Sequence, residues 1–344
     1  MSELLKISRR GFLAMPLVLA GCKFSPTEEV LEISGPTMGT TYRVTAVDKA
    51  GTLSESALRG AIETALAEVN AQLSNWHPGS EISRFNAQKG TESVPVSDML
   101  ATVMQGAETV NKASLGRFDT TAGPLIDLWG FGSKGTPRKP SEAEITAAQQ
   151  RTGHGQTLRV GAGSLQKIQP DTEIYLSAIG KGYGADHIAQ AIQGLGVRDF
   201  MIDIGGDLYT AGRNPDGVPW QIGIERPAAL SGGVLEVVGV SGLGMASSGD
   251  YRNYFEQDGK RYSHIIDPTT GSPITHKTAG ATVLADTAME ADAWATAMLI
   301  LGREKGLQVA QDHNIAVMFV DRDTESSELR FKSISSPRFE ALIS

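Results

Sequence analysis

Residues 285–302 read A-D-T-A-M-E-A-D-A-W-A-T-A-M-L-I-L-G, and this stretch predicts one buried helix. Thr287 is placed to act as the N-cap, and Glu290 three residues later completes a capping box. Gly302 follows the last apolar residue, where a left-handed C-terminal cap is expected. Because almost every residue between these ends is Ala, Met, Leu, Ile or Trp, we expect the helix to lie in the core.

Two oxygen-bearing side chains, Asp292 and Thr296, interrupt this apolar run four residues apart, so they lie on one face of the helix. A buried carboxylate is costly unless its charge is offset. One offset is the dipole at the helix N-terminus, with Thr296 bonding back to a carbonyl one turn earlier. Another is a hard cation, Mg²⁺ or Ca²⁺, which prefers carboxylate, hydroxyl and carbonyl oxygens. The pair alone leaves both interpretations open.

The composition is that of a globular protein. The chain has 344 residues, of which 40% are hydrophobic and 20% charged, enough to bury a full core as one large domain or two small ones. The formal net charge is −8 and no run of Lys or Arg is present, which argues against nucleic-acid binding.

The N-terminus is typical of an exported lipoprotein. Residues 8–13, S-R-R-G-F-L, resemble a twin-arginine signal, although a Sec route fits too. The apolar core Phe12–Ala20 is too short to span a bilayer, which disfavours a membrane-anchor helix. It ends in L-A-G-C, and Cys22 is the only cysteine in the chain. We expect a cleaved signal peptide over 1–21, lipidation of Cys22, a tether over 22–30 and a folded domain over 31–344.

The order of predicted elements favours an α+β fold. Helices do not alternate strictly with strands, which disfavours a doubly wound parallel sheet. We therefore expect mostly antiparallel or mixed sheets with packed helices in a single domain, for which an arrangement as two interleaved subdomains is the alternative. Caps and apolar spacing predict helices that begin after Ser54, at Ser97 or Asp98, and after Ser141, and strands over 200–204, 220–225, 235–240, 261–266 and 315–320.

Residues 175–186, Y-L-S-A-I-G-K-G-Y-G-A-D, predict a strand that enters a glycine-rich turn before a helix. Backbone N–H groups of glycines and a lysine at a helix N-terminus are typical of phosphate sites. The spacing matches neither the Rossmann nor the Walker pattern. A simple tight turn and an anion site both remain possible. His264, three residues before Asp267, is likewise either structural or a titrating group.

Eight short motifs occur in an order that covers almost the whole predicted domain. With them the chain resembles the ApbE family of flavin transferases, enzymes that move FMN from FAD onto a protein. The motifs are P-T-M-G-T-T-Y at 36–42, G-R-F-D-T-T-A-G-P-L at 116–125, L-W-G-F-G at 128–132, A-I-G-K-G-Y-G-A-D at 178–186, I-G-G-D at 204–207, S-G-D-Y at 248–251, S-H-I-I-D-P-T-T-G at 263–271 and A-D-A-W-A-T-A at 291–297.

The resemblance implies where the ligands bind. It implies that Asp292 and Thr296 hold Mg²⁺ together with the backbone carbonyl of Ala178. The positions that it implies for the FAD pocket are Met38, Trp76, Arg117, Phe118, Asp119, Lys181 and His264. Trp76 would offer an aromatic face to a flat ring, and Lys181 a positive charge to phosphate. Tyr175 stands where the family usually has an acidic residue, which puts one cofactor hydrogen bond in doubt.

The implied reaction cuts the FAD pyrophosphate, so that FMN passes to a threonine hydroxyl and AMP leaves. A base near the hydroxyl helps, and we expect His264 to serve, with Asp267 in reserve. A Mg²⁺-dependent FAD pyrophosphatase, in which water replaces the hydroxyl, is the alternative. A non-catalytic exported flavin-binding lipoprotein is less favoured, because binding a flavin ring requires no metal and would leave the Asp292 and Thr296 pair without a role. A serine hydrolase is disfavoured because no G-x-S-x-G elbow is present.

The resemblance also implies partners. Acceptors in the family are subunits of membrane electron-transfer complexes that carry a short flavinylation motif ending in Thr. We expect the chain to be exported to the periplasmic face and held by its lipid alone, with the inner membrane favoured.

Overall fold

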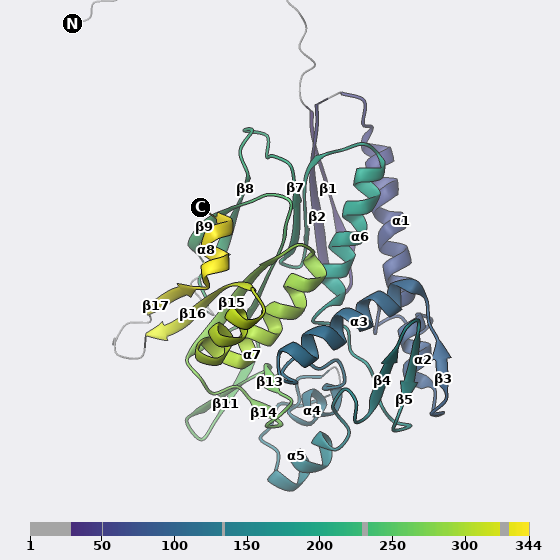
Figure 1. The fold of residues 1–344 in the computed structure, drawn as a ribbon, viewed down its shortest axis with the longest axis vertical. Coiled ribbons are helices and arrows are strands. Elements are labelled where there is room, and N and C mark those ends of the chain that lie inside the picture. The colour runs from purple at the N-terminus through teal and green to yellow at the C-terminus, as the bar shows by residue number, and fades with distance from the viewer. Residues whose placement is uncertain (1–28, 50, 133–134, 229–232, 324–329, 344) are drawn as a thin grey trace, which may run out of the picture.

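The structure is a computed structural model that describes residues 29–49, 51–132, 135–228, 233–323 and 330–343. Within these ranges the fold is α+β, and every pair of neighbouring strands is antiparallel, as the sequence predicts (Figure 1). The predicted signal peptide, Cys22 and most of the predicted tether lie outside the described residues. None of the described helices is both long and apolar enough to cross a membrane.

One large antiparallel sheet organises the molecule. Its eight strands follow the order β1-β2-β6-β7-β10-β15-β16-β17. Their bounds are β1 Glu29–Thr37, β2 Thr40–Asp48, β6 Asp199–Ile204, β7 Asp207–Ala211, β10 Gly244–Gly249, β15 Thr278–Ala285, β16 Ala316–Asp323 and β17 Arg330–Ser335. The predicted strands over 200–204 and 315–320 are the central parts of β6 and β16.

Both faces of this sheet are covered. On β16, Val317 and Phe319 pack toward helix α7 (Ala288–Asp312), while Met318 and Val320 pack toward strands β8 (Trp220–Glu225) and β9 (Val234–Val240). Helices α1 (Glu55–Leu73) and α6 (Gly180–Gly194) lie on the same face as α7, and short α8 (Pro337–Ile343) lies on the β8–β9 face. Burial on both faces explains why β16 is apolar without alternation.

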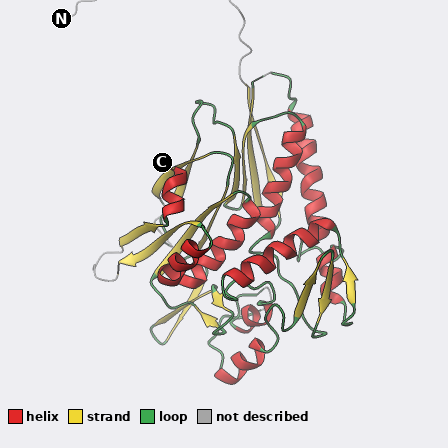
Figure 2. Cartoon of the chain, viewed as in Figure 1, coloured by secondary structure: helices red, strands yellow, loops and turns green. Residues whose placement is uncertain are grey.

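The smaller elements surround one end of the sheet (Figure 2). The helices there are α2 (Glu81–Ala87), α3 (Asp98–Ala113), α4 (Gly123–Leu128) and α5 (Glu142–Gln149). The strands are β3 (Ser93–Pro95), β4 (Leu158–Gly161), β5 (Ser164–Lys167), β11 (Tyr254–Gln257), β12 (Lys260–Ser263), β13 (Ile266–Asp267) and β14 (Ser272–Pro273). Ser54, Ser97 and Ser141 cap α1, α3 and α5 as predicted, because each side chain accepts a backbone N–H three residues on.

Helix α7 begins as the sequence predicts but does not end at Gly302. The Thr287 hydroxyl accepts the N–H of Glu290 at 3.1 Å. Gly302 does adopt a left-handed conformation, with φ 70° and ψ 168°, yet a second helical segment continues to Asp312. The break fits against His276, whose ring lies where a side chain at residue 302 would stand. Beyond the break, the Thr278 hydroxyl accepts the N–H of Arg303, so the chain can resume a helix.

Two predicted strands differ from the structure. The strand expected at the start of 175–186 is not present, because the backbone of residues 174–176 is held by the side chains of Asn75 and Asn86 instead of a sheet. The strand expected over 261–266 is interrupted at His264 and Ile265, which separate β12 from β13. Contacts between distant segments decide both cases.

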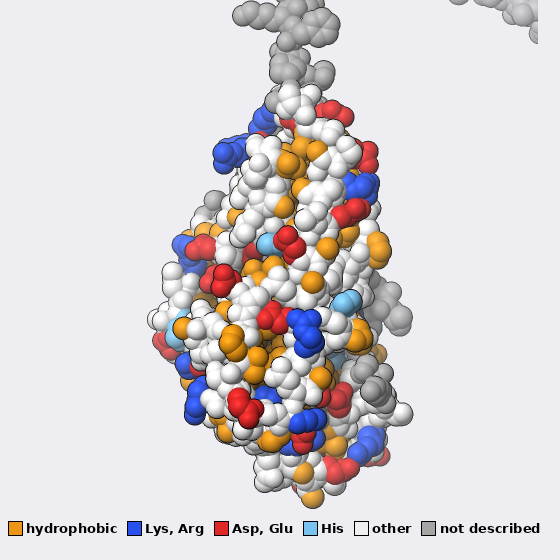
Figure 3. Space-filling model, turned by 90° about the vertical axis from the view of Figure 1, so that its right-hand side faces the viewer, with side chains coloured by type: hydrophobic (Ala, Val, Ile, Leu, Met, Phe, Trp, Pro, Cys, Tyr) orange, Lys and Arg blue, Asp and Glu red, His pale blue; other side chains and the backbone are white. Residues whose placement is uncertain are grey.

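Charges of both signs are mixed on the described surface shown in Figure 3, where Lys and Arg lie beside Asp and Glu. This face therefore shows no continuous basic area of the kind that binds nucleic acid.

Candidate active site

A cavity of about 800 Å³ lies where the large sheet splits open. Strands β7 and β10 pair only through Leu208, Tyr209, Gly244 and Met245, although β10 continues to Gly249. The end of β10 that pairs with β15 but not with β7, and the start of β7, line the cavity, together with the first turn of α6, one face of α7, the loop 117–123 and strand β8. The cavity is at the large end of the range for ligand pockets, about 300–1,000 Å³.

Two buried carboxylates and one lysine meet at one end of the cavity. Asp292 of α7 is 4% exposed and Asp207 of β7 is equally buried. The Lys181 ammonium of α6 contacts the Asp207 carboxylate and lies 3.5 Å from Asp292. Burial raises the pKa of Asp207 well above its ordinary value, and the Asp292 charge adds to this effect, while Lys181 opposes it. The cluster therefore has more negative than positive charge when both acids ionise.

The Lys181 ammonium interacts with both carboxylates of this cluster. Burial by itself would lower the pKa of Lys181, but the carboxylates of Asp292 and Asp207 outweigh burial and raise it. The ammonium is thus charged and already has two carboxylate partners. The predicted role of Lys181 beside a phosphate requires this ammonium to leave or share those partners.

The remaining oxygens at this end come from Thr296, Ser248 and Ala178, all of which line the cavity. The Thr296 hydroxyl lies 3.2 Å from the hydroxyl of Ser248 on β10. Asp292, Thr296 and Ala178 thus all line one cavity, which the predicted metal set requires. In the described chain, no three His, Cys, Asp or Glu side chains gather as a metal site. Mg²⁺ does not require such a group, since it commonly uses one or two carboxylates with waters and phosphates.

Helices α6 and α7 are joined directly beside these oxygens. The N–H of Gly182 donates to the Asp292 carboxylate at 3.1 Å. The Asp186 carboxylate accepts the N–H groups of Ala288 and Met289 at 2.7 and 2.9 Å, and so caps α7 from α6. Burial raises the pKa of Asp186 to about 7, although these two bonds oppose the rise. The position of Asp292 relative to Ala178 therefore depends on this helix contact.

His264 lines the same cavity between β12 and β13. Its Nδ1 lies 3.0 Å from the carbonyl of Asn253. Because a carbonyl only accepts, Nδ1 must hold the proton, and in the neutral ring Nε2 keeps a free lone pair. Burial lowers the pKa of His264, against the effect of that bond, so the neutral base predominates at neutral pH.

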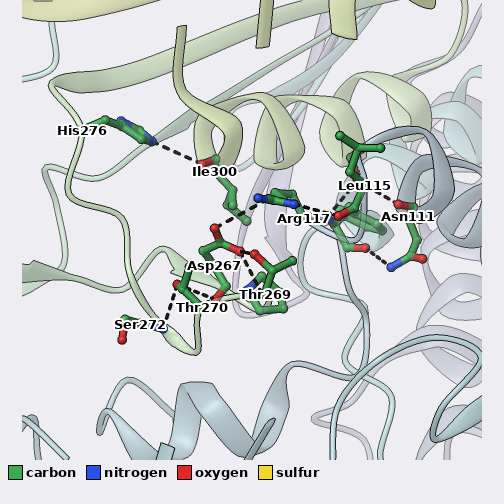
Figure 4. A network of polar contacts seen from close by, with 12 residues as sticks. Asn111, Leu115, Arg117, Asp267, Thr269, Thr270, Ser272, His276 and Ile300 are labelled. Carbon is green, nitrogen blue, oxygen red and sulfur yellow. Dashed lines mark hydrogen bonds and ion pairs between the residues drawn. The ribbon is translucent and has the colours of Figure 1, made fainter. Parts of the chain in front are cut away.

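Asp267, the second candidate for the catalytic base, does not line the main cavity. Figure 4 shows its carboxylate between Arg117 and Thr269. One oxygen lies 3.6 Å from the Arg117 Nε, and the other accepts the Thr269 hydroxyl at 2.7 Å and its N–H at 2.9 Å. Asp267 lines a second, smaller cavity of about 350 Å³, and only Arg117 and Ile300 line both. Arg117 and His264 therefore face the main cavity, whereas Asp267 lies behind Arg117.

The loop 117–123 presents backbone and side chains to the main cavity. Phe118 is 2% exposed, and Asn111 anchors its carbonyl at 2.7 Å. The Asp119 carboxylate accepts the N–H and the hydroxyl of Thr121 at 2.8 and 2.6 Å. Thr120 lies 2.8 Å from Nε2 of His154, a buried histidine outside the predicted set. These bonds hold the loop in one conformation.

Two predicted flavin contacts lie outside the cavity lining in this structure. The Met38 side chain packs against Gly180 and Gly184, so it supports the helix that carries Lys181. Trp76 follows α1 and is 71% exposed. Tyr175 does line the cavity; it packs against Gly123, and its hydroxyl donates to Glu173 at 2.9 Å.

Sequence reasoning from the residues alone did not single out Asp207, Ser248, Asp186 or His154. The first three belong to the motifs I-G-G-D, S-G-D-Y and A-I-G-K-G-Y-G-A-D, and the signal was a polar side chain next to glycines. Only the fold brings Asp207 to Asp292. His154 lies in a loop with no such motif.

Comparison with known proteins gives consistent matches. The model of the ApbE family matches residues 38–319. A relative from Vibrio cholerae called FAD:protein FMN transferase is 40% identical over 96% of this chain and 98% of its own length. A relative of the same name from Haemophilus influenzae is 40% identical over 90% of this chain and 91% of its own length.

Two solved structures have the same fold. The flavin transferase ApbE from Vibrio cholerae superimposes with a TM-score of 0.83 at 38% identity, over 92% of this chain and 99% of that one. The apo form of the Pseudomonas stutzeri flavinyl transferase ApbE gives 0.82 at 37% identity, over 92% and 97%.

Proposed function

The chain belongs to the ApbE family and is an FAD:protein FMN transferase, and we propose that it uses Mg²⁺ to move FMN from FAD to a threonine hydroxyl, with release of AMP. The observation that carries the proposal is that Asp292, Thr296 and Ala178, which come from two separate segments of the chain, all line one cavity. Ser248 adds a fourth oxygen beside Thr296.

The oxygens at this end fit a hard cation. Asp292 and Asp207 are both buried, and the single Lys181 ammonium leaves one negative charge unbalanced when both are ionised. Burial raises the pKa of Asp207, and the Asp292 charge adds to this rise. A divalent cation held by Asp292, Thr296 and the Ala178 carbonyl would remove this imbalance. When bound, Mg²⁺ supplies charge neutralisation on the phosphate oxygens and orients the pyrophosphate.

The residues of the chain then have separate tasks. Nε2 of His264 accepts the proton of the acceptor hydroxyl as its oxygen forms a bond to the FMN phosphorus. The bond between that phosphorus and the bridging pyrophosphate oxygen breaks, and AMP departs with the electron pair. Arg117 is held by Asp267 at the rim, and the loop 117–123 gives a fixed wall against which FAD can be oriented.

The direct test is to incubate the purified full chain with FAD, Mg²⁺ and candidate acceptor proteins, and to weigh each acceptor by mass spectrometry. Added FMN on a threonine, with one AMP per FMN transferred, is the expected result. Free FMN and AMP without modified acceptor would indicate the pyrophosphatase alternative. FAD that stays intact with Mg²⁺ and acceptor present would leave only flavin binding. Asp292→Asn should abolish transfer, and its circular dichroism spectrum should match that of the wild type.

We also propose that the chain is exported, lipidated at Cys22 and held at the periplasmic face, with acceptors in membrane electron-transfer complexes. The support is the sequence: two arginines, a short apolar core and a single cysteine after L-A-G. Labelling of cells with a clickable palmitate should mark the wild-type chain and leave Cys22→Ser unmarked. Equal labelling of both would refute the anchor.

A further inference from the structure

Strand β8 borders the main cavity along its free edge. Its residues alternate, with Trp220, Ile222 and Ile224 buried and the residues between them exposed. Successive side chains of a strand point to opposite faces, so a space beside one face touches every second residue. The cavity instead contacts every residue over 221–225. It therefore runs along the edge of the strand.

That edge has unused backbone groups. In an antiparallel pair, every second residue directs its N–H and C=O toward the partner strand and the others point away. Within the part of the chain that the structure describes, β8 pairs with β9 alone, and no backbone bond from residues 221–225 reaches any other segment. An unpaired edge of this kind is a template for pairing with another chain.

The outer face of the same hairpin carries two exposed valines of β9 beside the exposed residues of β8. Val234 and Val237 of β9 are each 56% exposed, and they lie opposite Glu225 and Gly223. Gly223 has no side chain, and an added Cβ there would touch Val234 at 3.1 Å. The two exposed valines therefore lie beside the bare backbone of Gly223. Exposed apolar side chains that lie together commonly mark contact with another protein.

The far end of the edge is polar. Glu225 accepts hydrogen bonds from the Tyr251 hydroxyl at 2.8 Å and from Arg252 at 2.5 Å, and all three residues line the cavity. The edge of β8 thus leads from this polar rim into the same cavity that holds Asp292 and His264.

We propose that the acceptor protein presents its hydroxyl in an extended segment that adds to the free edge of β8 as a further strand. This inference rests on the proposed transfer to a protein hydroxyl and names how that protein is bound. Backbone pairing is almost independent of side chains, so one edge can align different acceptors, while alternate side chains provide specificity. Residues 221–225 span roughly 13 Å, which allows pairing with about five acceptor residues.

The orientation follows from the same geometry. Side chains of the added strand alternate between the cavity and the outer face of the hairpin. The hydroxyl residue must face the cavity, so its immediate neighbours face outward, beside the exposed residues Gln221, Gly223 and Glu225 of β8.

Cysteine crosslinking tests the pairing. The enzyme is the full chain with Cys22→Ser and one new cysteine, either Gln221→Cys on β8 or the control Glu32→Cys on β1, another exposed position on an edge strand. The probe is the purified apo acceptor domain that gains FMN from the wild-type enzyme, with single cysteines moved along the residues around the modified hydroxyl. A short bifunctional thiol reagent then joins the two proteins.

Crosslinks to Gln221→Cys should be strong at every second acceptor position and at least tenfold weaker between them, while Glu32→Cys should give none with this pattern. Hydrogen exchange of residues 221–225 should slow at least tenfold when the acceptor is added, while exchange in β1 should stay the same. Flavinylation without alternating crosslinks and without protection of β8 would overturn strand pairing alone. Failure of the wild-type enzyme to modify any acceptor would overturn the proposed function and this inference with it.

Discussion

Replacing Gly182 by alanine should separate the two helices that carry the proposed metal ligands. A Cβ at this position would stand 2.8 Å from the Met289 Cα and closer still to the Ala288 carbonyl. Ordinary contacts are 3.4 Å or longer and the Ala288 carbonyl oxygen would lie at 2.2 Å, so α6 and α7 must move apart by about 1.2 Å. The Gly182 N–H would then lose its alignment with the Asp292 carboxylate, now at 3.1 Å.

The expected cost follows from these contacts. Overpacking of this kind costs about 1–3 kcal/mol, and a weakened hydrogen bond to a charged group adds about 1 kcal/mol or more. Alanine in a helix returns up to about 1 kcal/mol relative to glycine. We expect a net loss of about 2 kcal/mol, which for a folded domain of about 300 residues corresponds to a fall in Tm of about 3 °C.

The assay is thermal unfolding with and without Mg²⁺ and FAD. Ligand binding raises the Tm of the wild type by mass action, and the rise should be smaller for Gly182→Ala because Ala178 and Asp292 no longer face each other correctly. Gly194→Ala is the matched control, since it lies on the same helix with no atom within 4 Å of an added Cβ. It should keep the wild-type Tm or exceed it. The reasoning is refuted if Gly182→Ala keeps both the Tm and the Mg²⁺ response of the wild type.

Three further predictions concern His264, Asp186 and Met38. Because burial lowers the pKa of His264 below 6.5, the wild-type transfer rate should fall only on the acid side of pH 6.5. His264→Gln should slow transfer about 10²–10⁴-fold and should lose this fall in rate at acid pH. An unchanged pH–rate profile would exclude the base role. Because burial raises the pKa of Asp186 to about 7, the folded protein binds this proton more tightly than the unfolded chain does, so the unfolding free energy should fall as pH rises from about 4 to about 7. Asp186→Asn should lack that slope in urea unfolding, and equal slopes would contradict the assignment. Met38→Ala should lower stability by roughly 1–3 kcal/mol through lost packing on α6, whereas Trp76→Ala, at an exposed position, should leave the Tm unchanged; equal Tm losses would count against this contrast.

Local chemistry made much of the fold predictable. The caps at Ser54, Ser97, Ser141 and Thr287 are short-range bonds between residues three apart, so the sequence alone locates the helix starts. The Gly302 break was predictable for the same reason, because a left-handed residue is needed there. The continuation of the helix beyond Gly302 was not predictable, since it depends on Thr278 of a distant strand, whose hydroxyl accepts the N–H of Arg303.

The site was predictable where one helix supplies it. Asp292 and Thr296 share a face by helical spacing, and the structure places both on the cavity. Asp207 could not be added from the residues alone, because it reaches Asp292 only through Lys181 and the order of strands in the sheet. The absence of a strand before α6 was equally hidden, since Asn75 and Asn86 replace the sheet partner from about ninety to a hundred residues away.

The most direct test of the account is the location of a divalent cation in crystals grown with FAD. Mn²⁺ substituted for Mg²⁺ gives an anomalous signal that identifies the ion without reference to the protein. The account predicts one peak at about 2.0–2.3 Å from oxygens of Asp292, Thr296 and the Ala178 carbonyl, next to the FAD pyrophosphate. A peak with other ligands, or bound FAD with no peak between α6 and α7, would contradict it.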